Sequence, residues 1–465
     1  MRFLTLSLLL PALASAQSLY EPGFQWSPKG PDAALPVENA VTVKSMVVVQ
    51  LGSDHVVGLN ADTGLERWRF SSKAHAIRGM ALRGDTILVE AEQLQGLAPM
   101  TGEEKWQFPL NCFPGKCNSR VRLVTDELTV LTGFDGREDN VLLLDTQSGA
   151  RQWPNWVSAP AIKDVLITAG ALVLSSGAEP FEVAALDRFT SRERWRLRPQ
   201  GVDGPATGMQ TDGTVLNAWW ASGSSDVVLG LDLATGKTLA ELTVARRKAS
   251  ETELRGTAPG VFVAYQPSRL TGGALRAWNN RTAEPLWKKD YPEIVGAPVL
   301  LGDRILVRQS GSGVTIEALS AATGDSLWRY NRPDATSVDW RFEGGRAIAT
   351  FEGKSRFVGI FDLIAGRIEG VAPVDGARPD HVRWTGGSLY LFRGPHVDRL
   401  DGTDGDALVA RFETLARGGQ MDDASALAKK TKPFVQELAA AAKINKVAGG
   451  QGFQVTSEKM RAGGL

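Results

Sequence analysis

The sequence has few of the residues from which metal and nucleophilic sites are built. Its 465 residues include two cysteines and four histidines. No two histidines stand at the i, i+2 or i, i+4 spacing that places a pair of zinc ligands side by side. The chain also lacks a G-x-S-x-G turn, the local sequence that presents a nucleophilic serine. The sequence therefore predicts no catalytic residue and no metal ligand.

Excess charge and long apolar runs are missing as well. Lys plus Arg and Asp plus Glu each number 52, so the formal charge is zero. A protein that neutralises a phosphate backbone normally carries a basic excess, which argues against nucleic acid as a partner. After the first residues, no run approaches the roughly 18 apolar residues of a transmembrane helix. We expect no transmembrane segment, and the composition leaves the oligomeric state open.

The N-terminus is typical of a signal peptide. Arg2 precedes an apolar run over residues 3–13, and Ala14-Ser15-Ala16 forms a small-x-small cleavage site ahead of Gln17. We expect residues 1–16 to be removed and the protein to be periplasmic or secreted. No cysteine stands near the cleavage site to carry a lipid anchor, and residues 17–40, rich in Pro and Gly, predict an extended lead-in.

Cys112 and Cys117 enclose the turn-rich stretch Phe-Pro-Gly-Lys. In an oxidising compartment this spacing favours a local disulfide that closes a loop. The alternative is a redox pair, for which a C-x-x-C spacing at a helix N-terminus would be typical. The pair has neither feature.

A repeated frame is the strongest feature of the chain. "LNADTGLERW" (59–68) ends in a tryptophan four residues after the glycine, and similar stretches recur at steps of 38–47 residues. The tryptophan position is occupied in turn by Trp68, Trp106, Trp153, Trp195, Ala240, Trp287, Trp328, Gly370 and Val409. Short β-branched runs such as "MVVVQLG" and "HVVGLN" precede the frame, which indicates strands joined by hairpins. Each unit therefore predicts a blade of four antiparallel strands.

The chemistry of the frame suits a hairpin between the third and fourth strands. Asp or Asn and then Thr can accept or donate hydrogen bonds within the turn, and Gly supplies the positive φ. The tryptophan then stands on the outermost strand, where its indole can cover the gap to the next blade and its N–H can reach a backbone carbonyl. We predict a structural role for Trp68, Trp106, Trp153, Trp195, Trp287 and Trp328.

The D-x-x-T-G-x-x-x-W frame, fullest in "LNADTGLERW", "LDLATGKTL" and "LSAATGDSLW", resembles the pyrroloquinoline-quinone-like (PQQ-like) propeller repeat. The resemblance covers about residues 40–412. It implies an all-β fold, a β-propeller of four-stranded antiparallel blades assigned to residues 41–412. Eight blades are favoured because that number is common in the family. Nine units are counted, so nine blades are the alternative.

Two further segments stand outside the frame. Residues 413–465 are rich in Ala, Leu, Lys and Gln and then in Gly, which predicts a short helical appendage and a Gly-rich tail, either packed on the propeller or acting as a docking arm. Trp219 and Trp220 are adjacent in "NAWWASGSSD". Because neighbours on a strand face opposite ways, one is expected in the core and the other is a candidate ligand contact.

The resemblance leaves two functions. Quinoprotein dehydrogenases of this repeat family hold PQQ with calcium bound by Glu, Asn and Asp, over a Trp floor and commonly below a disulfide of adjacent cysteines. No two cysteines are adjacent here, and none of those ligands matches a motif of this chain. We therefore expect a non-catalytic scaffold that binds envelope or secreted proteins, without a cofactor. The alternative is a PQQ-binding oxidoreductase or quinone sensor.

Overall fold

The computed structural model describes residues 17–448 except 73–75, 111–118, 135–137, 160, 224, 246–254, 268–272, 293, 295, 344, 355 and 386. The chain divides into two compact units. The larger unit is Trp26–Ser337 with Phe392–Val397. The smaller unit comprises the described residues of Met1–Gln25, Val338–Leu391 and Asp398–Leu465.

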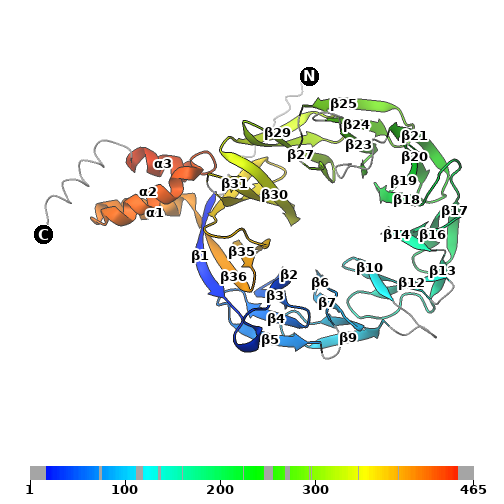
Figure 1. Ribbon diagram of the computed structural model, residues 1–465, viewed down its shortest axis with the longest axis horizontal. Coiled ribbons are helices and arrows are strands. Elements are labelled where there is room, and N and C mark those ends of the chain that lie inside the picture. Colours follow the sequence, from blue (N-terminus) through cyan, green and yellow to red (C-terminus); the bar gives the residue numbers. More distant parts are fainter. Residues whose placement is uncertain are drawn as a thin grey trace, which may run out of the picture. The chain divides into compact units, whose positions relative to one another are not determined.

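In the described part of the larger unit, strands form seven four-stranded antiparallel sheets that follow one another in chain order (Figure 1). The first four sheets are β2 (Val37–Val43), β3 (Met46–Leu51), β4 (His55–Asn60) and β5 (Glu66–Ser71); β6 (Gly79–Arg83), β7 (Thr86–Glu90), β8 (Gln93–Leu97) and β9 (Glu104–Pro109); β10 (Arg120–Val124), β11 (Leu128–Phe134), β12 (Asp139–Asp145) and β13 (Val157–Ala159); and β14 (Ile162–Ile167), β15 (Ala171–Ser176), β16 (Val183–Asp187) and β17 (Glu193–Leu197). The next three are β18 (Ala206–Thr211), β19 (Val215–Ser222), β20 (Ser225–Asp232) and β21 (Thr238–Ala245); β22 (Arg255–Ala258), β23 (Val261–Pro267), β24 (Gly273–Asn279) and β25 (Pro285–Tyr291); and β26 (Val299–Leu301), β27 (Arg304–Gly311), β28 (Gly313–Ser320) and β29 (Ser326–Arg332). A short 3₁₀ helix, η1 (Gly30–Asp32), precedes β2.

Burial differs from strand to strand within a sheet. Every residue of β3 and of β15 is buried, because both faces of these strands are covered. In the outer strands β5 and β17 one residue is buried, namely Trp68 and Trp195. The second strands therefore read as continuous apolar runs, while the outer strands are polar around one tryptophan.

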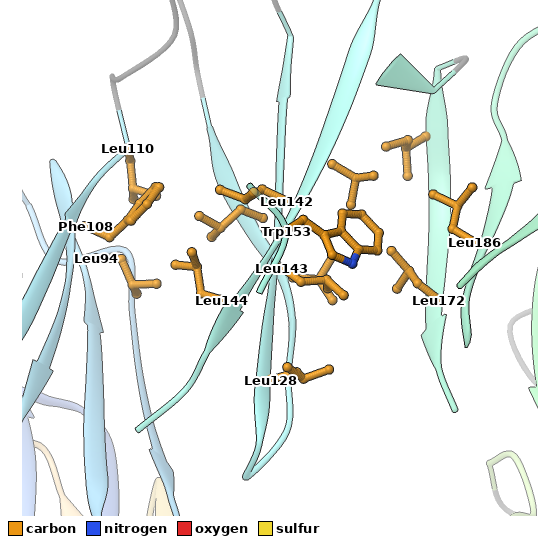
Figure 2. Close-up of a cluster of buried hydrophobic side chains, with 14 of the residues drawn as sticks. Leu94, Phe108, Leu110, Leu128, Leu142, Leu143, Leu144, Trp153, Leu172 and Leu186 are labelled. Carbon is orange, nitrogen blue, oxygen red and sulfur yellow. The ribbon is translucent and has the colours of Figure 1, made fainter. Parts of the chain in front are cut away.

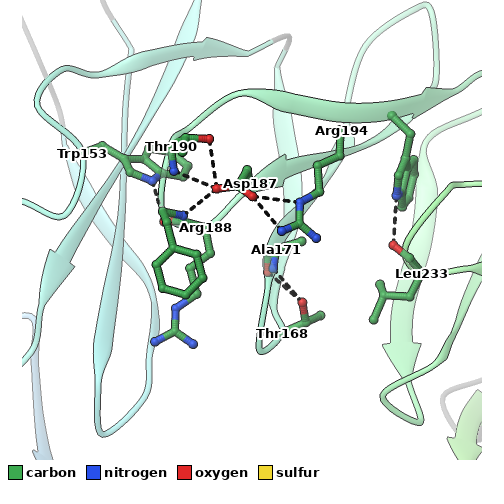
Figure 3. Close-up of polar contacts among 10 residues, drawn as sticks. Trp153, Thr168, Ala171, Asp187, Arg188, Thr190, Arg194 and Leu233 are labelled. Carbon is green, nitrogen blue, oxygen red and sulfur yellow. Dashed lines mark hydrogen bonds and ion pairs between the residues drawn. The ribbon is translucent and has the colours of Figure 1, made fainter.

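The turn before most of the outer strands is held by an Asp or Asn side chain. In Figure 3, Asp187 Oδ1 accepts the backbone N–H groups of Phe189 (3.0 Å) and Thr190 (2.8 Å), and Oδ2 pairs with Arg194 at 2.6 Å. The bonds from Arg194 and Thr190 hold the pKa of Asp187 far below its usual range. The equivalent side chains Asn60, Asp145 and Asp232 accept backbone N–H groups in the same way.

The repeat tryptophans link one sheet to the next. Each of five indole N–H groups donates to a backbone carbonyl in the turn of the following sheet: Trp68 to Pro99 (3.0 Å), Trp106 to Gln147 (3.0 Å), Trp153 to Arg188 (2.8 Å), Trp195 to Leu233 (3.0 Å) and Trp287 to Ala321 (2.9 Å). Trp328 occupies the same place on β29 and is half-buried. An indole, buried in the first four cases and half-buried at Trp287, thus supplies both apolar area and a satisfied polar group at each of these gaps.

Close approach of indole and turn explains the glycine of the frame. Gly102 has φ 71°, and a Cβ there would lie 2.5 Å from the Trp68 ring. Ala283 takes the glycine position with φ 60°, and the residue facing it from the previous outer strand is Ala240 rather than tryptophan. Ser191 also takes this position, with φ 60°, in the turn whose Arg188 carbonyl accepts the Trp153 N–H, so the glycine can be replaced with or without an indole from the previous sheet.

Apolar side chains fill the space between neighbouring sheets. Figure 2 shows Trp153, which is fully buried, among Leu142 and Leu143 of β12, Leu172 of β15 and Leu186 of β16. Leu94, Phe108 and Leu110 extend the same cluster toward the preceding sheet. One continuous core therefore joins three consecutive sheets in this part of the larger unit.

The remaining strands form one eight-stranded sheet, in the order β30-β31-β32-β33-β1-β36-β35-β34. Its strands are β1 (Ser18–Trp26), β30 (Ala335–Glu343), β31 (Arg346–Gly353), β32 (Phe357–Asp362), β33 (Arg367–Pro373), β34 (His381–Thr385), β35 (Ser388–Arg393) and β36 (His396–Asp404). The N-terminal strand β1 completes a second four-strand group with β34–β36, so the described strands give nine groups in eight sheets. The prediction of a propeller with four-stranded antiparallel blades and a helical appendage is confirmed.

Strand β1 enters this sheet where the frame has lost its tryptophan. Gly370 holds the tryptophan position of its unit, and β1 pairs in parallel with β33 through Ser18–Gly370 and Leu19–Val371. A Cβ at Gly370 would lie 2.5 Å from the Tyr20 ring. The glycine thus leaves space for a tyrosine from the segment that was expected to be an extended lead-in.

The C-terminal appendage contains α1 (Gly405–Arg417), α2 (Met421–Thr431), the 3₁₀ helix η2 (Lys432–Phe434) and α3 (Ala439–Ala448). Asp404 caps α1 by accepting the N–H groups of Asp406 and Ala407. The helix begins inside the range assigned to the propeller, so Val409 lies on a helix and not on an outer strand. The Phe434 ring packs edge-on against Phe357 of β32, with centroids 5.4 Å apart.

Glu21 of β1 links the C-terminal helices to the eight-stranded sheet. Its carboxylate accepts hydrogen bonds from Arg411 of α1 (2.8 Å), Lys430 of α2 (3.0 Å) and Thr403 (3.3 Å). Burial opposes ionisation, but the Lys430 bond and the charges of Lys430 and Arg411 hold the pKa of Glu21 below its ordinary value of 4.5. One carboxylate therefore joins the N-terminal strand to two C-terminal helices.

Replacing Trp287 by Ala should destabilise the protein by about 3–5 kcal/mol, because it empties the gap between two sheets and leaves the Ala321 carbonyl without its donor. The measurement is denaturant unfolding of the purified protein. Leu286→Ala is the matched control, since Leu286 lies on the same strand and is 46% exposed. A loss below about 1 kcal/mol for Trp287→Ala would contradict the structural role.

Ala283→Gly should stabilise the protein by about 0.5–1 kcal/mol, because a left-handed backbone strains alanine more than the added flexibility of glycine costs. Gly324→Ala should have the opposite sign, since it strains a φ of 75° and places a Cβ 2.7 Å from the Trp287 ring. Thermal unfolding of both variants tests the pair. Equal effects of the two substitutions would refute this account of the turn.

Glu21→Gln should destabilise the folded protein by about 1–3 kcal/mol at pH 7, because two cationic donors lose their charged acceptor. The folded-state pKa lies below the unfolded value, so this stabilisation is present above pH 4.5 and disappears as the pH falls through the folded value. Melting temperatures at pH 7 and pH 3 check it. Glu413→Gln, at an exposed ion pair with Arg417, is the control; a Glu21→Gln effect that persists undiminished at pH 3 would contradict the assignment.

Candidate functional site

The residues singled out in the sequence do not converge on one site. Cys112 and Cys117, like the expected signal peptide, lie outside the described residues. Trp219 and Trp220 lie on β19 and are 7% and 0% exposed. They face opposite sides of the sheet, as expected, and belong to different apolar clusters, with the Trp219 ring 5.9 Å from Phe262. Both indoles are packing residues, and neither presents an exposed face to a ligand.

A cavity of about 280 Å³ opens instead in the smaller unit. It is lined by Asp339, Trp340 and Arg341 of β30, Ile348 and Thr350 of β31, Arg378, Pro379 and Asp380 of the loop before β34, and Val382 of β34. Strands β30 and β34 are the two edges of the eight-stranded sheet. The cavity thus lies where both ends of one sheet contribute side chains.

The cavity has an apolar floor and a charged rim. Ile348, Val382 and Thr350 are 2%, 5% and 8% exposed. On the rim, Arg378 Nη2 pairs with Asp339 Oδ2 at 2.7 Å, and both side chains are about half exposed. Arg341 Nη2 donates to the Asp380 backbone carbonyl at 3.4 Å. Two arginines and two aspartates therefore surround an opening whose lining is mainly polar, with Ile348 and Val382 as apolar residues at its floor.

Local structure fixes the loop that carries Arg378 and Asp380. Gly376 adopts φ 76°, which turns the chain after β33, and its carbonyl accepts a bond of 2.5 Å from Arg356 Nη1. Arg356 is in turn held by Glu352 at 2.6 Å. Pro379 is buried, so its two charged neighbours are directed outward. The loop is therefore anchored on both sides of the residues that reach the cavity.

Metal and membrane features give no second candidate in the described chain. Among the described residues, no three His, Cys, Asp or Glu side chains are grouped so that they could hold a metal ion. Within the same residues, no helix has the length and apolarity to span a bilayer.

A family model described as outer membrane protein assembly factor BamB matches residues 24–111, 95–266 and 257–383, which together cover most of the chain. The chain belongs to this BamB family. The third matched segment contains every residue that lines the cavity, so the site lies in the part of the chain that has BamB-type repeats. The resemblance to a PQQ-like propeller repeat is thereby confirmed.

Solved structures share the fold at low identity. BamB from Moraxella catarrhalis is 16% identical, with a TM-score of 0.42 and coverage of 71% of this chain and 99% of that chain. The quinohemoprotein alcohol dehydrogenase ADHIIG from Pseudomonas putida HK5 is 13% identical, with a TM-score of 0.39 and coverage of 72% of each chain. A comparison with curated protein sequences gives no match.

The cavity residues were not predicted from the sequence, although the sequence contains a pattern that could have indicated them. "DWR" (339–341) and "RPD" (378–380) place acidic and basic side chains two residues apart, in opposite order. The two stretches are separated by close to one repeat period, which puts them at comparable positions of successive units. Trp340, like Trp219 and Trp220, also stands outside the D-x-x-T-G-x-x-x-W frame.

Proposed function

We propose that this BamB-family propeller is a non-catalytic scaffold of the cell envelope that binds other proteins through the cavity of its smaller unit. The family match over residues 24–383 supports an envelope role, since the family is described by an outer-membrane assembly factor. An expected signal peptide at residues 1–16 supports export to the periplasm or beyond.

The observation that carries the proposal is the chemistry of the cavity rim. Arginine and tryptophan are enriched at protein interfaces, where they contribute a large share of the binding energy. Trp340 and Arg341 are both half-buried at the cavity, beside the ion pair of Arg378 and Asp339. A partner can exchange such a half-exposed pair for intermolecular bonds at small cost, because surface ion pairs contribute little to stability.

The edge strands supply a second type of contact. Strands β30 and β34 each pair on one side only within the eight-stranded sheet. An edge strand offers backbone N–H and C=O groups to an added strand, while neighbouring side chains provide specificity. The position of the cavity between β30 and β34 therefore suits an extended polypeptide segment.

A photo-crosslinking amino acid at Trp340, introduced in the organism's own cells, should form an adduct with a discrete envelope protein. The adduct should be lost or strongly reduced when Arg341 and Arg378 are both replaced by Ala, because the rim then loses its interface cations. Mass spectrometry of the adduct identifies the partner.

Two controls test whether the adduct is specific to the cavity. The same crosslinker at Leu286, an exposed residue of β25 in the larger unit, should not give that adduct. Arg417→Ala removes one cation that is 80% exposed on α1 and should leave the Trp340 adduct intact. If folded protein gives no protein adduct at Trp340, or the same adduct at Leu286, the cavity is not the binding site.

A further inference from the structure

The interior of the cavity has donors that the protein itself does not use. Thr350 is 8% exposed, and its hydroxyl has no hydrogen-bond partner among the described residues. In the same part of the chain, the 3.4 Å bond to the Asp380 carbonyl is the one hydrogen bond of the Arg341 guanidinium, which makes no ion pair there. Because Thr350 lines the cavity, its hydroxyl can bind a water molecule or a ligand there. The cavity thus presents a guanidinium fork and a hydroxyl to an incoming acceptor.

The charges around the opening define the acceptor further. Asp339 pairs with Arg378 at 2.7 Å, and the rim carries one further carboxylate, Asp380, and one further guanidinium, Arg341. The rim is therefore close to neutral, and a phosphate, with about two negative charges, would lack the cations to balance it. A single carboxylate matches one guanidinium in charge and in its two coplanar oxygens.

The residues at the floor of the cavity indicate which kind of chemical group carries the carboxylate. Ile348 and Val382 are buried, and the buried Pro379 of the loop also lines the cavity. An apolar group placed against these side chains would be removed from water, which contributes about 25 cal/mol for each Å² buried. The volume of about 280 Å³ lies at the small end of the range for ligand pockets, so it fits one or two residues rather than a folded surface.

We infer that this cavity binds a carboxylate carried next to an apolar side chain, with Arg341 and Thr350 as its donors. This inference rests on the proposed function in one respect, namely that the natural carrier is a polypeptide. The carboxylate has two sources in a polypeptide, the chain terminus and an acidic side chain. Both present the same group to Arg341.

Calorimetric titration of the full chain tests the inference with three capped peptides. The first is acetyl-Ala-Ala-Leu with a free carboxyl terminus, the second is its amide, and the third is acetyl-Ala-Glu-Leu-amide. We expect saturable binding of the first or the third and at least about tenfold weaker binding of the amide, because a hydrogen bond to a charged group is worth about 1.5–3 kcal/mol. Binding of the first alone assigns a chain terminus, and binding of the third alone assigns an acidic side chain.

Matched variants assign the donors. Arg341→Ala should weaken binding at least about tenfold, and Thr350→Val, which keeps the shape of the side chain, by a few-fold. Arg417→Ala should bind as the wild type does. Should Arg341→Ala fail to fold, the comparison of peptide and amide on the wild-type protein decides alone. Because the rim is nearly neutral, raising the salt concentration should weaken binding only modestly.

Three outcomes would overturn the inference. They are binding of the amide as tight as that of the tighter carboxylate peptide, unchanged affinity in folded Arg341→Ala, and no binding of any carboxylate peptide. A fourth titration with PQQ, with and without calcium, covers the other ligand class; if PQQ alone binds, the polypeptide carboxylate is rejected. A protein crosslink at Trp340 together with a negative peptide titration would reject this inference and retain the proposed function.

Discussion

The larger unit depends on one repeated interaction, the hydrogen bond from an indole on one sheet to a turn carbonyl of the next. An isolated four-stranded sheet with apolar residues on both faces is unstable in water, so each sheet needs its neighbours. The indole provides that contact at the outer strand of a sheet, by packing on the turn of the next sheet and donating to its carbonyl. Leucine and valine clusters such as the one around Trp153 fill the space closer in.

The indole in turn dictates the local sequence of the turn it covers. At Gly102, Gly149 and Gly236 a Cβ would lie within 2.6 Å of a tryptophan ring, so these positions need glycine for space as well as for φ. Two turns carry another residue at this position with φ 60°, Ala283 opposite Ala240 and Ser191 in the turn that binds Trp153. Positive φ persists at Ala283 without the indole, so the turn geometry comes from the Asn279 side chain and the hairpin.

This dependence explains why the sequence predicts the blades well and the smaller unit poorly. Turn, strand and tryptophan follow from residues within about ten positions of one another, and the pattern recurs. The insertion of β1 beside β33 joins Leu19 to Val371, and no local signal in "SLYEPGFQW" indicates it. The cavity could not be predicted for a similar reason, since Arg341 and Arg378 belong to opposite edges of the eight-stranded sheet and line one cavity only in the folded chain. Trp219 and Trp220 show the converse, because their adjacency suggests a site and burial gives both a packing role.

Departures from the frame coincide with the features that distinguish this chain. Gly370 lacks the tryptophan, and Tyr20 from the N-terminal strand fills its place. Val409 lies on α1, so the last unit takes its fourth strand from β1 and releases the following residues to form the appendage. Glu21 on that strand then binds Arg411 and Lys430, which couples the two ends of the chain. The cavity lies in this same part of the chain. Functional sites are expected where the residues of a repeat depart from its sequence pattern.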